Sequence, residues 1–143
     1  MLIGEHHHTL DPKGRTAVPA KFRARFSDGL VVTRGMDHCL FGYPPAEWGK
    51  MVEQVTKLPI SQQNARAFSR LMLAGAVEVE LDAQGRILIP EYLRRYAQLD
   101  KKIVIVGVHS RIELWDERAW QQYQQQTEAN AADIAEQIGH LGM

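Results

Sequence analysis

The chain has 143 residues, of which 45% are apolar and 24% are charged, values that are ordinary for one compact globular domain or two small halves sharing a core. No apolar run approaches the roughly 20 residues that cross a bilayer, and the N-terminus lacks the core of a signal peptide, so no membrane association is expected. Cys39 is the single cysteine, which excludes an intramolecular disulfide and fits a reducing cytoplasm.

The charges are unevenly distributed although the formal net charge is zero. Within residues 1–25, five basic side chains outnumber two acidic ones, whereas within residues 113–143 six acidic side chains outnumber one basic one. A neutral molecule can therefore have a basic surface, where the local field would attract an anionic partner. Alternatively, both charged segments are ordinary solvent-exposed surfaces that bind no partner, and this interpretation explains the same distribution equally well.

The first half of the chain predicts short strands separated by turns and helices. Its expected strands, marked by apolar and β-branched residues, are residues 2–4, 8–10, 15–18, 30–33 and 39–43. Pro19 suits the first position of a short helix, because a helix leaves the N–H at that position without a partner. Phe22 and Phe26 lie one turn apart on this helix and are expected in the core.

The turn after the first strands is specified by its residue types. Residues 11–14, Asp-Pro-Lys-Gly, place Asp, Pro and Gly where a type I turn prefers them. A glycine that can adopt positive φ at position 14 also suits a hairpin loop with a bulge. These residues therefore predict a tight hairpin that raises Lys13 and Arg15 away from the sheet.

Two longer helices are expected after Pro44 and Pro45. The first is predicted to end at Leu58, because the residue before a proline avoids α geometry. Ser61 is expected to cap the second helix. The apolar residues at helical spacing are Trp48, Met51, Val52 and Val55 in the first helix and Ala65, Phe68 and Met72 in the second.

The second half of the chain repeats a phrase of the first half. Residues 9–23 are TLDPKGRTAVPAKFR and residues 80–94 are ELDAQGRILIPEYLR, so identical residues recur at an offset of 71. The matched pairs are Asp11 and Asp82, Gly14 and Gly85, Arg15 and Arg86, Pro19 and Pro90, and Arg23 and Arg94. Because an internal repeat reports architecture directly, and no flexible linker separates the copies, two similar units packed together are expected.

The remaining elements of the second half follow the plan of the first. The expected strands are residues 77–81, 86–89, 103–106 and 112–115, with a short helix over residues 90–96. Tyr43 and Trp48 are echoed by Trp115 and Trp120, in each case an aromatic residue at a strand end followed by a tryptophan on the next helix. A Gln-rich helix is expected to run from Asp116 to a stop at Gly139.

The repeated turn with its arginine is the strongest candidate for a functional site. An arginine makes two parallel hydrogen bonds to a phosphate or to a guanine edge, so Lys13, Arg15 and Arg86 could bind nucleic acid. Alternatively, each aspartate pairs with the arginine four residues later and only locks its turn. A lone copy would favour that structural role, whereas two copies in matching context favour a binding module.

No other part of the sequence predicts an active site. The histidines at positions 6–8 alternate across a strand, so at most two could bind one metal, and a surface or edge-strand location is the better interpretation. Cys39 lies in an apolar strand and is expected to be buried rather than reactive. The turn at Gly14 lacks the longer glycine-rich stretch of a P-loop. No catalytic residue, metal, cofactor or small-molecule substrate is therefore expected.

The sequence resembles the MraZ family, bacterial proteins built from two tandem AbrB-like units, over essentially the whole chain. The segments that carry the resemblance are residues 4–11 with 13–15, residues 18–23, residues 39–44 with Glu47 and Trp48, residues 65–68, Leu81 and Asp82 with Gly85 and Arg86, and residues 111–115. A match this long makes the histidine run native rather than the remnant of a purification tag.

The resemblance implies a mainly β fold with helices, of the α+β class, in which two AbrB-like units with swapped hairpins form one pseudo-twofold, barrel-like core with peripheral helices. The expected division is a first unit over residues 1–49, connecting helices over 50–74, a second unit over 75–118 and a C-terminal helix over 119–143. The resemblance also implies a cytoplasmic, nucleoid-associated transcription factor that forms ring-shaped homo-oligomers. Such proteins bind short direct repeats in double-stranded DNA, generally at the promoter of their own division and cell-wall gene cluster.

The site residues follow from the same resemblance. The family's Asp-x-x-x-Arg motif maps onto Asp11 with Arg15 and onto Asp82 with Arg86. The expected DNA-binding residues are Arg15, Lys13, Arg86, Lys21 and Arg23, and the expected turn-structuring residues are Asp11, Gly14, Asp82 and Gly85. The first turn has Lys13 where the second has neutral Gln84, so the first hairpin is expected to bind DNA more strongly. The alternative is a non-enzymatic oligomeric scaffold whose paired Asp and Arg residues are purely structural.

Overall fold

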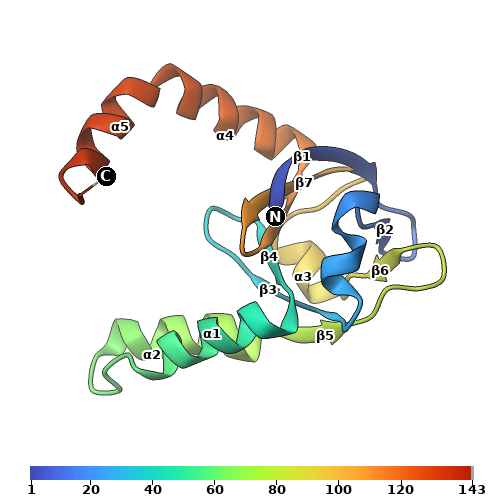
Figure 1. Cartoon of the computed structure of the whole chain (residues 1–143), viewed down its shortest axis with the longest axis horizontal. Coiled ribbons are helices and arrows are strands. Elements are labelled where there is room, and N and C mark those ends of the chain that lie inside the picture. The colour runs from blue at the N-terminus through green and yellow to red at the C-terminus, as the bar shows by residue number, and fades with distance from the viewer. Residues whose placement is uncertain (143) are drawn as a thin grey trace.

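The computed structural model describes residues 1–142 and has an α+β fold, as predicted (Figure 1). The elements are, in chain order, β1 (Leu2–Thr9), β2 (Arg15–Ala17), η1 (Ala20–Phe26), β3 (Leu30–Arg34), β4 (Leu40–Tyr43), α1 (Pro45–Thr56), α2 (Gln63–Ser69), η2 (Arg70–Ala74), β5 (Val77–Val79), β6 (Arg86–Leu88), α3 (Glu91–Tyr96), β7 (Lys102–His109), β8 (Ile112–Asp116), α4 (Glu117–Ala129) and α5 (Ala131–Gly139). The segment η1 is a 3₁₀ helix, and η2 is a π-helical turn that continues α2.

The two halves of the chain exchange strands. The six-stranded sheet has the order β1-β7-β8-β4-β3-β5 with antiparallel pairing throughout, and β2 and β6 form a separate antiparallel pair. Thus β1 of the first half pairs with β7 of the second, and β5 of the second half pairs with β3 of the first. Thr16 pairs with Ile87, its own counterpart in the repeat, which places the pseudo-twofold axis at the centre of the β2–β6 pair.

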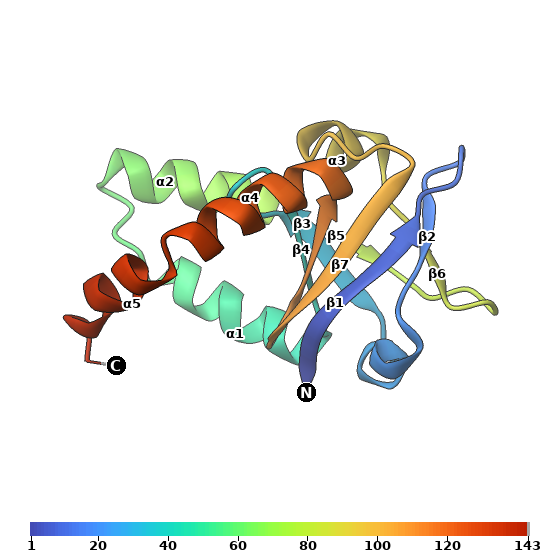
Figure 2. The same ribbon diagram turned by 90° about the horizontal axis from the view of Figure 1, so that it is seen from above.

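The sheet stays open in the part of the chain that the structure describes. Strands β1 and β5 are its two ends and do not pair with each other. The β2–β6 pair instead covers one face of the sheet, together with η1 and α3 (Figure 2). The expected barrel-like core is therefore a layered arrangement of an open sheet and a short two-stranded ribbon.

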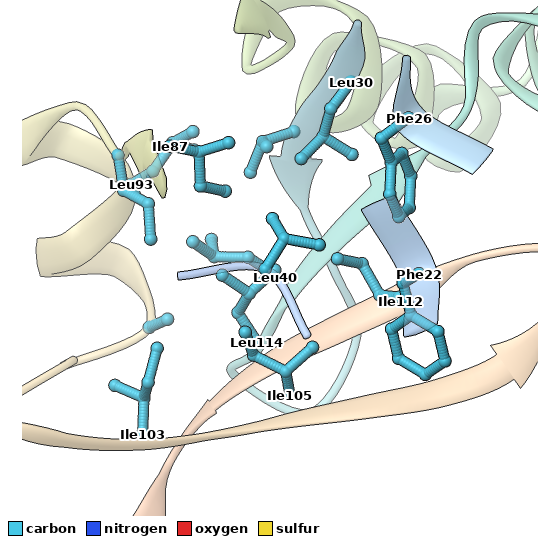
Figure 3. Close-up of a cluster of buried hydrophobic side chains, with 14 of the residues drawn as sticks. Phe22, Phe26, Leu30, Leu40, Ile87, Leu93, Ile103, Ile105, Ile112 and Leu114 are labelled. Atoms are coloured by element: carbon cyan, nitrogen blue, oxygen red, sulfur yellow. The ribbon is translucent and has the colours of Figure 1, made fainter. Parts of the chain in front are cut away.

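The main core lies between these layers and draws on both halves. Figure 3 shows Phe22 and Phe26 of η1 facing the same interior as Leu93 of α3 and Ile105 of β7. All four side chains are buried, as predicted for the two phenylalanines. A second cluster, which includes Trp115, lies on the other face of the sheet, and residues of α1, α2 and α4 pack against this cluster. Since neither half alone supplies a complete core, the two units fold as one body.

The second helix begins later than the sequence predicts. Residue 62 precedes α2, and no side chain caps its first turn, so the expected cap at Ser61 is wrong. The N–H of Gln62 donates to the carbonyl of Pro59 at 3.0 Å, and Arg66 Nη1 donates to the carbonyl of Ile60 at 3.0 Å. Ser61 is thus enclosed in a turn, away from the N-terminal position where its hydroxyl would accept the capping bond.

The expected single C-terminal helix is two helices, α4 and α5, that meet at Asn130. The backbone of Asn130 leaves α geometry, with φ −111° and ψ 14°. Its side-chain Nδ2 donates to the carbonyl of Gln126 at 2.9 Å, which is a local bond that competes with the regular helical pattern. The helix after this break ends at Gly139, the predicted stop.

Candidate nucleic-acid interface

The first repeated turn, residues 11–15, is a hairpin organised by one carboxylate, and we call it hairpin 1. Asp11 Oδ1 accepts the backbone N–H groups of Lys13 at 2.9 Å and of Arg15 at 2.8 Å, while Asp11 Oδ2 accepts Arg15 Nε at 2.7 Å. The N–H of Gly14 donates to the carbonyl of Asp11 at 2.9 Å, and Gly14 has the predicted positive φ of 89°. Four bonds thus converge on one aspartate, which explains why Asp, Gly and Arg recur at this spacing.

The second repeated turn, residues 82–86 and here called hairpin 2, has the same geometry. Asp82 Oδ1 accepts the N–H groups of Gln84 at 2.9 Å and Arg86 at 2.8 Å, and Asp82 Oδ2 accepts Arg86 Nε at 2.9 Å. Gly85 has φ 78° and donates its N–H to the carbonyl of Asp82 at 2.9 Å. Two copies of one local sequence therefore build two equivalent structures.

Each Asp–Arg pair also leaves part of its arginine available to a ligand. The ion pair uses Nε of Arg15 and of Arg86, so the two terminal nitrogens of each guanidinium lie outside that bond. The side chains of Arg15 and Arg86 are 33% and 32% exposed. A guanidinium held by Nε presents its outer nitrogens as a pre-oriented fork that fits a phosphate or a guanine edge. The structural and the binding interpretations of the motif are therefore compatible.

Acid is expected to loosen both hairpins, because hydrogen bonds lower the pKa values of their aspartates. The backbone N–H of Arg15 is the largest cause for Asp11, and that of Arg86 for Asp82. Since the folded pKa lies below the unfolded one, the stabilisation is complete at neutral pH and disappears as the pH falls through the folded pKa, below the ordinary value of about 3.9. NMR titration of the two carboxyls checks this, and a midpoint at or above the ordinary value would contradict it. Asp11→Asn removes the first titration and leaves that of Asp82 as an internal control.

The two hairpins flank the β2–β6 pair, one at each end of it (Figure 2). Strands β2 and β6 pair so that Arg15 is opposite Leu88 and Ala17 is opposite Arg86. Both loops project from the end that lies opposite α2 and α5, as Figures 1 and 2 show. The pairing therefore places both predicted arginine forks on one composite surface built from the two halves.

The predicted basic residues near hairpin 1 differ in their surroundings. Lys13 and Lys21 are exposed, Lys13 in the hairpin and Lys21 on η1. Arg23 is half-buried, and its Nε donates to the carbonyl of Val18 at 3.0 Å. The guanidinium of Arg23 lies against hairpin 2, where a Cβ on Gly85 would come within 2.5 Å of Arg23 Cζ. Arg23 therefore has an internal contact that the sequence did not predict.

Arg94, the counterpart of Arg23, is not among the site residues expected from the sequence. Arg94 Nε donates to the carbonyl of Ile89 at 2.9 Å, and its guanidinium lies against Gly14 of hairpin 1. The offset of 71 residues from Arg23 could have identified it. Its contact with hairpin 1 joins residues 80 positions apart, which no local pattern predicts.

The three histidines line β1 with alternating exposure. His6 and His8 are half-buried and His7 is exposed, as expected for a strand. His6 contacts Phe22 edge-on, with ring centroids 4.9 Å apart, and His7 Nδ1 lies 3.3 Å from Glu117 Oε2 of α4. Burial lowers the pKa of His8, as do the nearby charges of His6 and Arg23. Among residues 1–142, no three His, Cys, Asp or Glu side chains are grouped as metal ligands.

The single cysteine and the helices also bear on which kinds of function the chain can have. Cys39 is fully buried, its Sγ donates to the carbonyl of Met36 at 3.1 Å, and burial raises the pKa of the thiol far above its ordinary range, as expected for a packed rather than reactive cysteine. Over the described part of the chain, every helix is too short or too polar to cross a bilayer.

The family model described as "MraZ protein, putative antitoxin-like" matches the chain twice, over residues 1–71 and over residues 72–139. The chain belongs to the MraZ family. It is 51% identical over 138 residues to a protein of Natranaerobius thermophilus, with 96% of both chains covered. It is 48% identical to a relative from Halothermothrix orenii and 50% identical to one from Desulfitobacterium hafniense, in both cases over 143 residues and the full length of each chain. All three relatives carry the name transcriptional regulator MraZ.

Proposed function

We propose that this MraZ-family chain is a sequence-specific, DNA-binding transcriptional regulator and not an enzyme. The observation that carries the proposal is the pair of partly exposed arginine forks, Arg15 and Arg86, each held in the same way by equivalent hairpins on one end of the molecule. The name of the curated relatives supports it. Paired forks on one surface suit a ligand with repeating phosphates and guanine edges, which is double-stranded DNA.

Within this proposal the two hairpins have unequal roles. Arg15 and Arg86 bind base edges or phosphates, and exposed Lys13 and Lys21 bind phosphate. Hairpin 2 has Gln84 where hairpin 1 has Lys13, so hairpin 1 contributes the larger electrostatic share. Asp11 and Asp82 orient the arginines and keep both turns closed.

We further propose that copies of the chain assemble into a ring through their helices. Helix α5 is exposed over its whole length, yet it presents apolar side chains such as Ile134, 41% exposed, and Ile138, 38% exposed. An amphipathic helix that buries nothing within its own chain is typical of a protein interface. The partner that fits best is a second copy, because the chain itself has a complementary surface.

That complementary surface is the groove between α1 and α2. It has a volume of about 340 Å³, and its apolar lining includes Leu58 and Ile60. Residues 45–74 hold four basic side chains against two acidic ones, whereas residues 117–139 hold four acidic side chains against one basic one. A contact of α5 on one copy with this groove on the next joins two different surfaces, and such contacts form rings when the rotation closes.

The expected DNA target is a set of short direct repeats at the promoter of the protein's own gene, upstream of the division and cell-wall gene cluster, with the protein in the cytoplasm and associated with the nucleoid. Spaced repeats suit a ring, because several subunits bound at once raise the avidity by about 10²–10⁴. The two units, residues 1–49 and 75–118, supply the hairpins in this arrangement, with connecting helices over residues 50–74 and a C-terminal helix over residues 119–143. Avidity reconciles tight binding with a net charge of zero.

A gel shift with the DNA immediately upstream of the gene tests the function directly. The wild-type protein is expected to select this fragment over a shuffled fragment of equal length, and log K should fall linearly with log[salt] by about 0.9 for each phosphate contact. The shuffled fragment is the control for non-specific binding. Equal affinity for both fragments would reject sequence-specific regulation and favour the oligomeric scaffold.

A further inference from the structure

We propose that each DNA-binding hairpin is held in place by an arginine of the opposite half: Arg94 positions hairpin 1, and Arg23 positions hairpin 2. The consequence for DNA rests on the proposed function, whereas the effect on the hairpins does not. Arg94 thereby becomes a positioning residue for Arg15, although the two lie 79 positions apart in the chain.

The contact between Arg94 and hairpin 1 is close and directional. Arg94 Nε donates to the carbonyl of Ile89 at 2.9 Å, which fixes the plane of the guanidinium. A Cβ on Gly14 would lie 2.8 Å from both Nε and Cζ of Arg94, closer than real atoms approach. The guanidinium therefore lies directly on the backbone of Gly14, the residue between Lys13 and Arg15.

The backbone of Ile89 provides a second link between Arg94 and Gly14. The N–H of Ile89 donates to the carbonyl of Gly14 at 2.9 Å, while the carbonyl of Ile89 accepts Arg94 Nε. Hairpin 1 is thus held at Gly14 by two adjacent contacts, one from the Ile89 backbone and one from the Arg94 side chain. The Asp11–Arg15 pair shapes the loop internally, and these two contacts set its position on the core.

The helix that carries Arg94, α3, is itself fixed to the core by burial and by hydrogen bonds. In α3, Leu93 is fully buried, Tyr92 Oη donates to the carbonyl of Gly75 at 2.9 Å, and Tyr96 Oη donates to the carbonyl of Gly35 at 2.7 Å. A hollow of about 550 Å³ lies beside hairpin 1 and is lined by residues that include Pro12 and Arg94. Because this side of the hairpin is loosely packed, the Arg94 contact is a large part of what holds it.

Hairpin 2 is held by the equivalent set of contacts, related to those of hairpin 1 by the pseudo-twofold axis. The N–H of Val18 donates to the carbonyl of Gly85 at 2.9 Å, the carbonyl of Val18 accepts Arg23 Nε at 3.0 Å, and the Arg23 guanidinium lies on Gly85. The same three-part contact occurs twice, each time between halves. The halves are therefore coupled at the proposed DNA surface as well as in the core.

Amide hydrogen exchange of the DNA-free protein tests the positioning role without assuming any DNA binding. Arg94→Ala is expected to raise exchange at least tenfold in residues 11–15 and to leave residues 82–86 unchanged, and Arg23→Ala should do the reverse. Arg95→Ala is the matched control, since Arg95 is the next residue, is exposed and pairs with Glu91 across one helical turn. Faster exchange in both hairpins alike, or in neither, would overturn the proposal.

Conservative variants keep the test decisive if an alanine variant fails to fold. Arg94→Lys keeps the charge but lacks both Nε and the flat guanidinium, so residues 11–15 should still exchange faster than in wild type. Native exchange in that variant would show that charge alone matters and would reject the contact. Arg94→Gln keeps a donor for the Ile89 carbonyl and should give an intermediate rate.

A double-variant cycle then connects the contact to DNA. At reduced salt, Arg94→Ala is expected to weaken promoter binding about tenfold, to add little to Arg15→Ala, and to combine additively with Arg86→Ala. Additivity with Arg15→Ala would overturn the positioning role. If the wild type itself does not select the promoter, the proposed function fails, while the exchange result stands or falls separately.

Discussion

Replacing Arg15 by alanine is expected to abolish selective binding of promoter DNA, while circular dichroism and oligomer size stay unchanged. A bidentate arginine contact discriminates by about 1–3 kcal/mol, or roughly 5- to 150-fold for each hairpin, and a ring loses one such contact in every subunit bound to DNA. The fold should survive because Asp11 Oδ1 still accepts the backbone N–H groups of residues 13 and 15. Gel shift, circular dichroism and size-exclusion chromatography measure the three properties.

A charge-matched control separates this effect from a general loss of positive charge. Lys57→Ala also removes one positive charge, but Lys57 follows α1, away from the end of the molecule that bears the hairpins (Figure 1). On a fragment with one repeat, where avidity of the ring does not contribute, its affinity should be close to that of the wild type, whereas that of Arg15→Ala should be lower. Native affinity in Arg15→Ala would refute the site assignment, and a smaller oligomer in that variant would support the scaffold hypothesis instead.

A glutamate at Ile134 is expected to dissociate the ring and to weaken binding to a promoter fragment with several repeats by about 10²–10⁴. Full burial of an isoleucine contributes about 1.5–3 kcal/mol, and a buried unpaired carboxylate opposes association further. The isolated subunit should fold normally, because α5 is exposed along its whole length. Analytical ultracentrifugation gives the oligomer size, and gel shifts with one repeat and with several repeats separate intrinsic affinity from avidity.

The matched control for this variant is Ala132→Glu. It introduces the same charge into the same helix, but residue 132 lies on the opposite side of α5 from Ile134, given about 100° per residue. This variant should keep its ring and its affinity. The assembly proposal fails if Ile134→Glu stays fully oligomeric, or if its affinity for a single repeat falls below that of the wild type as far as its affinity for the array does.

The local geometry of the hairpins was predictable because its causes lie within five residues. Asp11, Gly14 and Arg15 each act on neighbours in the same turn: a carboxylate that accepts nearby N–H groups, a glycine that adopts positive φ, and a guanidinium that returns to the carboxylate. The copy at positions 82–86 confirms that this chemistry suffices, since Pro12 and Lys13 are replaced there by Ala83 and Gln84 without changing the bonds.

The helix ends were less predictable, because they depend on competing local bonds of similar strength. The cap expected at Ser61 is lost to a turn between Pro59 and Gln62. The C-terminal helix breaks at Asn130, whose side chain bonds to the carbonyl of Gln126. In both places the sequence is compatible with two arrangements, and small differences in hydrogen bonding decide between them.

By itself, the sequence determined the repeat, the two hairpins and the arginine that each presents, because apolar patterning and turn chemistry act over short distances, while its family resemblance implied the α+β class. Only the tertiary structure decided which half supports which hairpin. The exchange of β1 and β5, and the contacts of Arg94 with Gly14 and of Arg23 with Gly85, join distant residues. Such contacts arise only when buried side chains from both halves, such as Phe22 and Leu93, pack into one core and bring each hairpin against the opposite half.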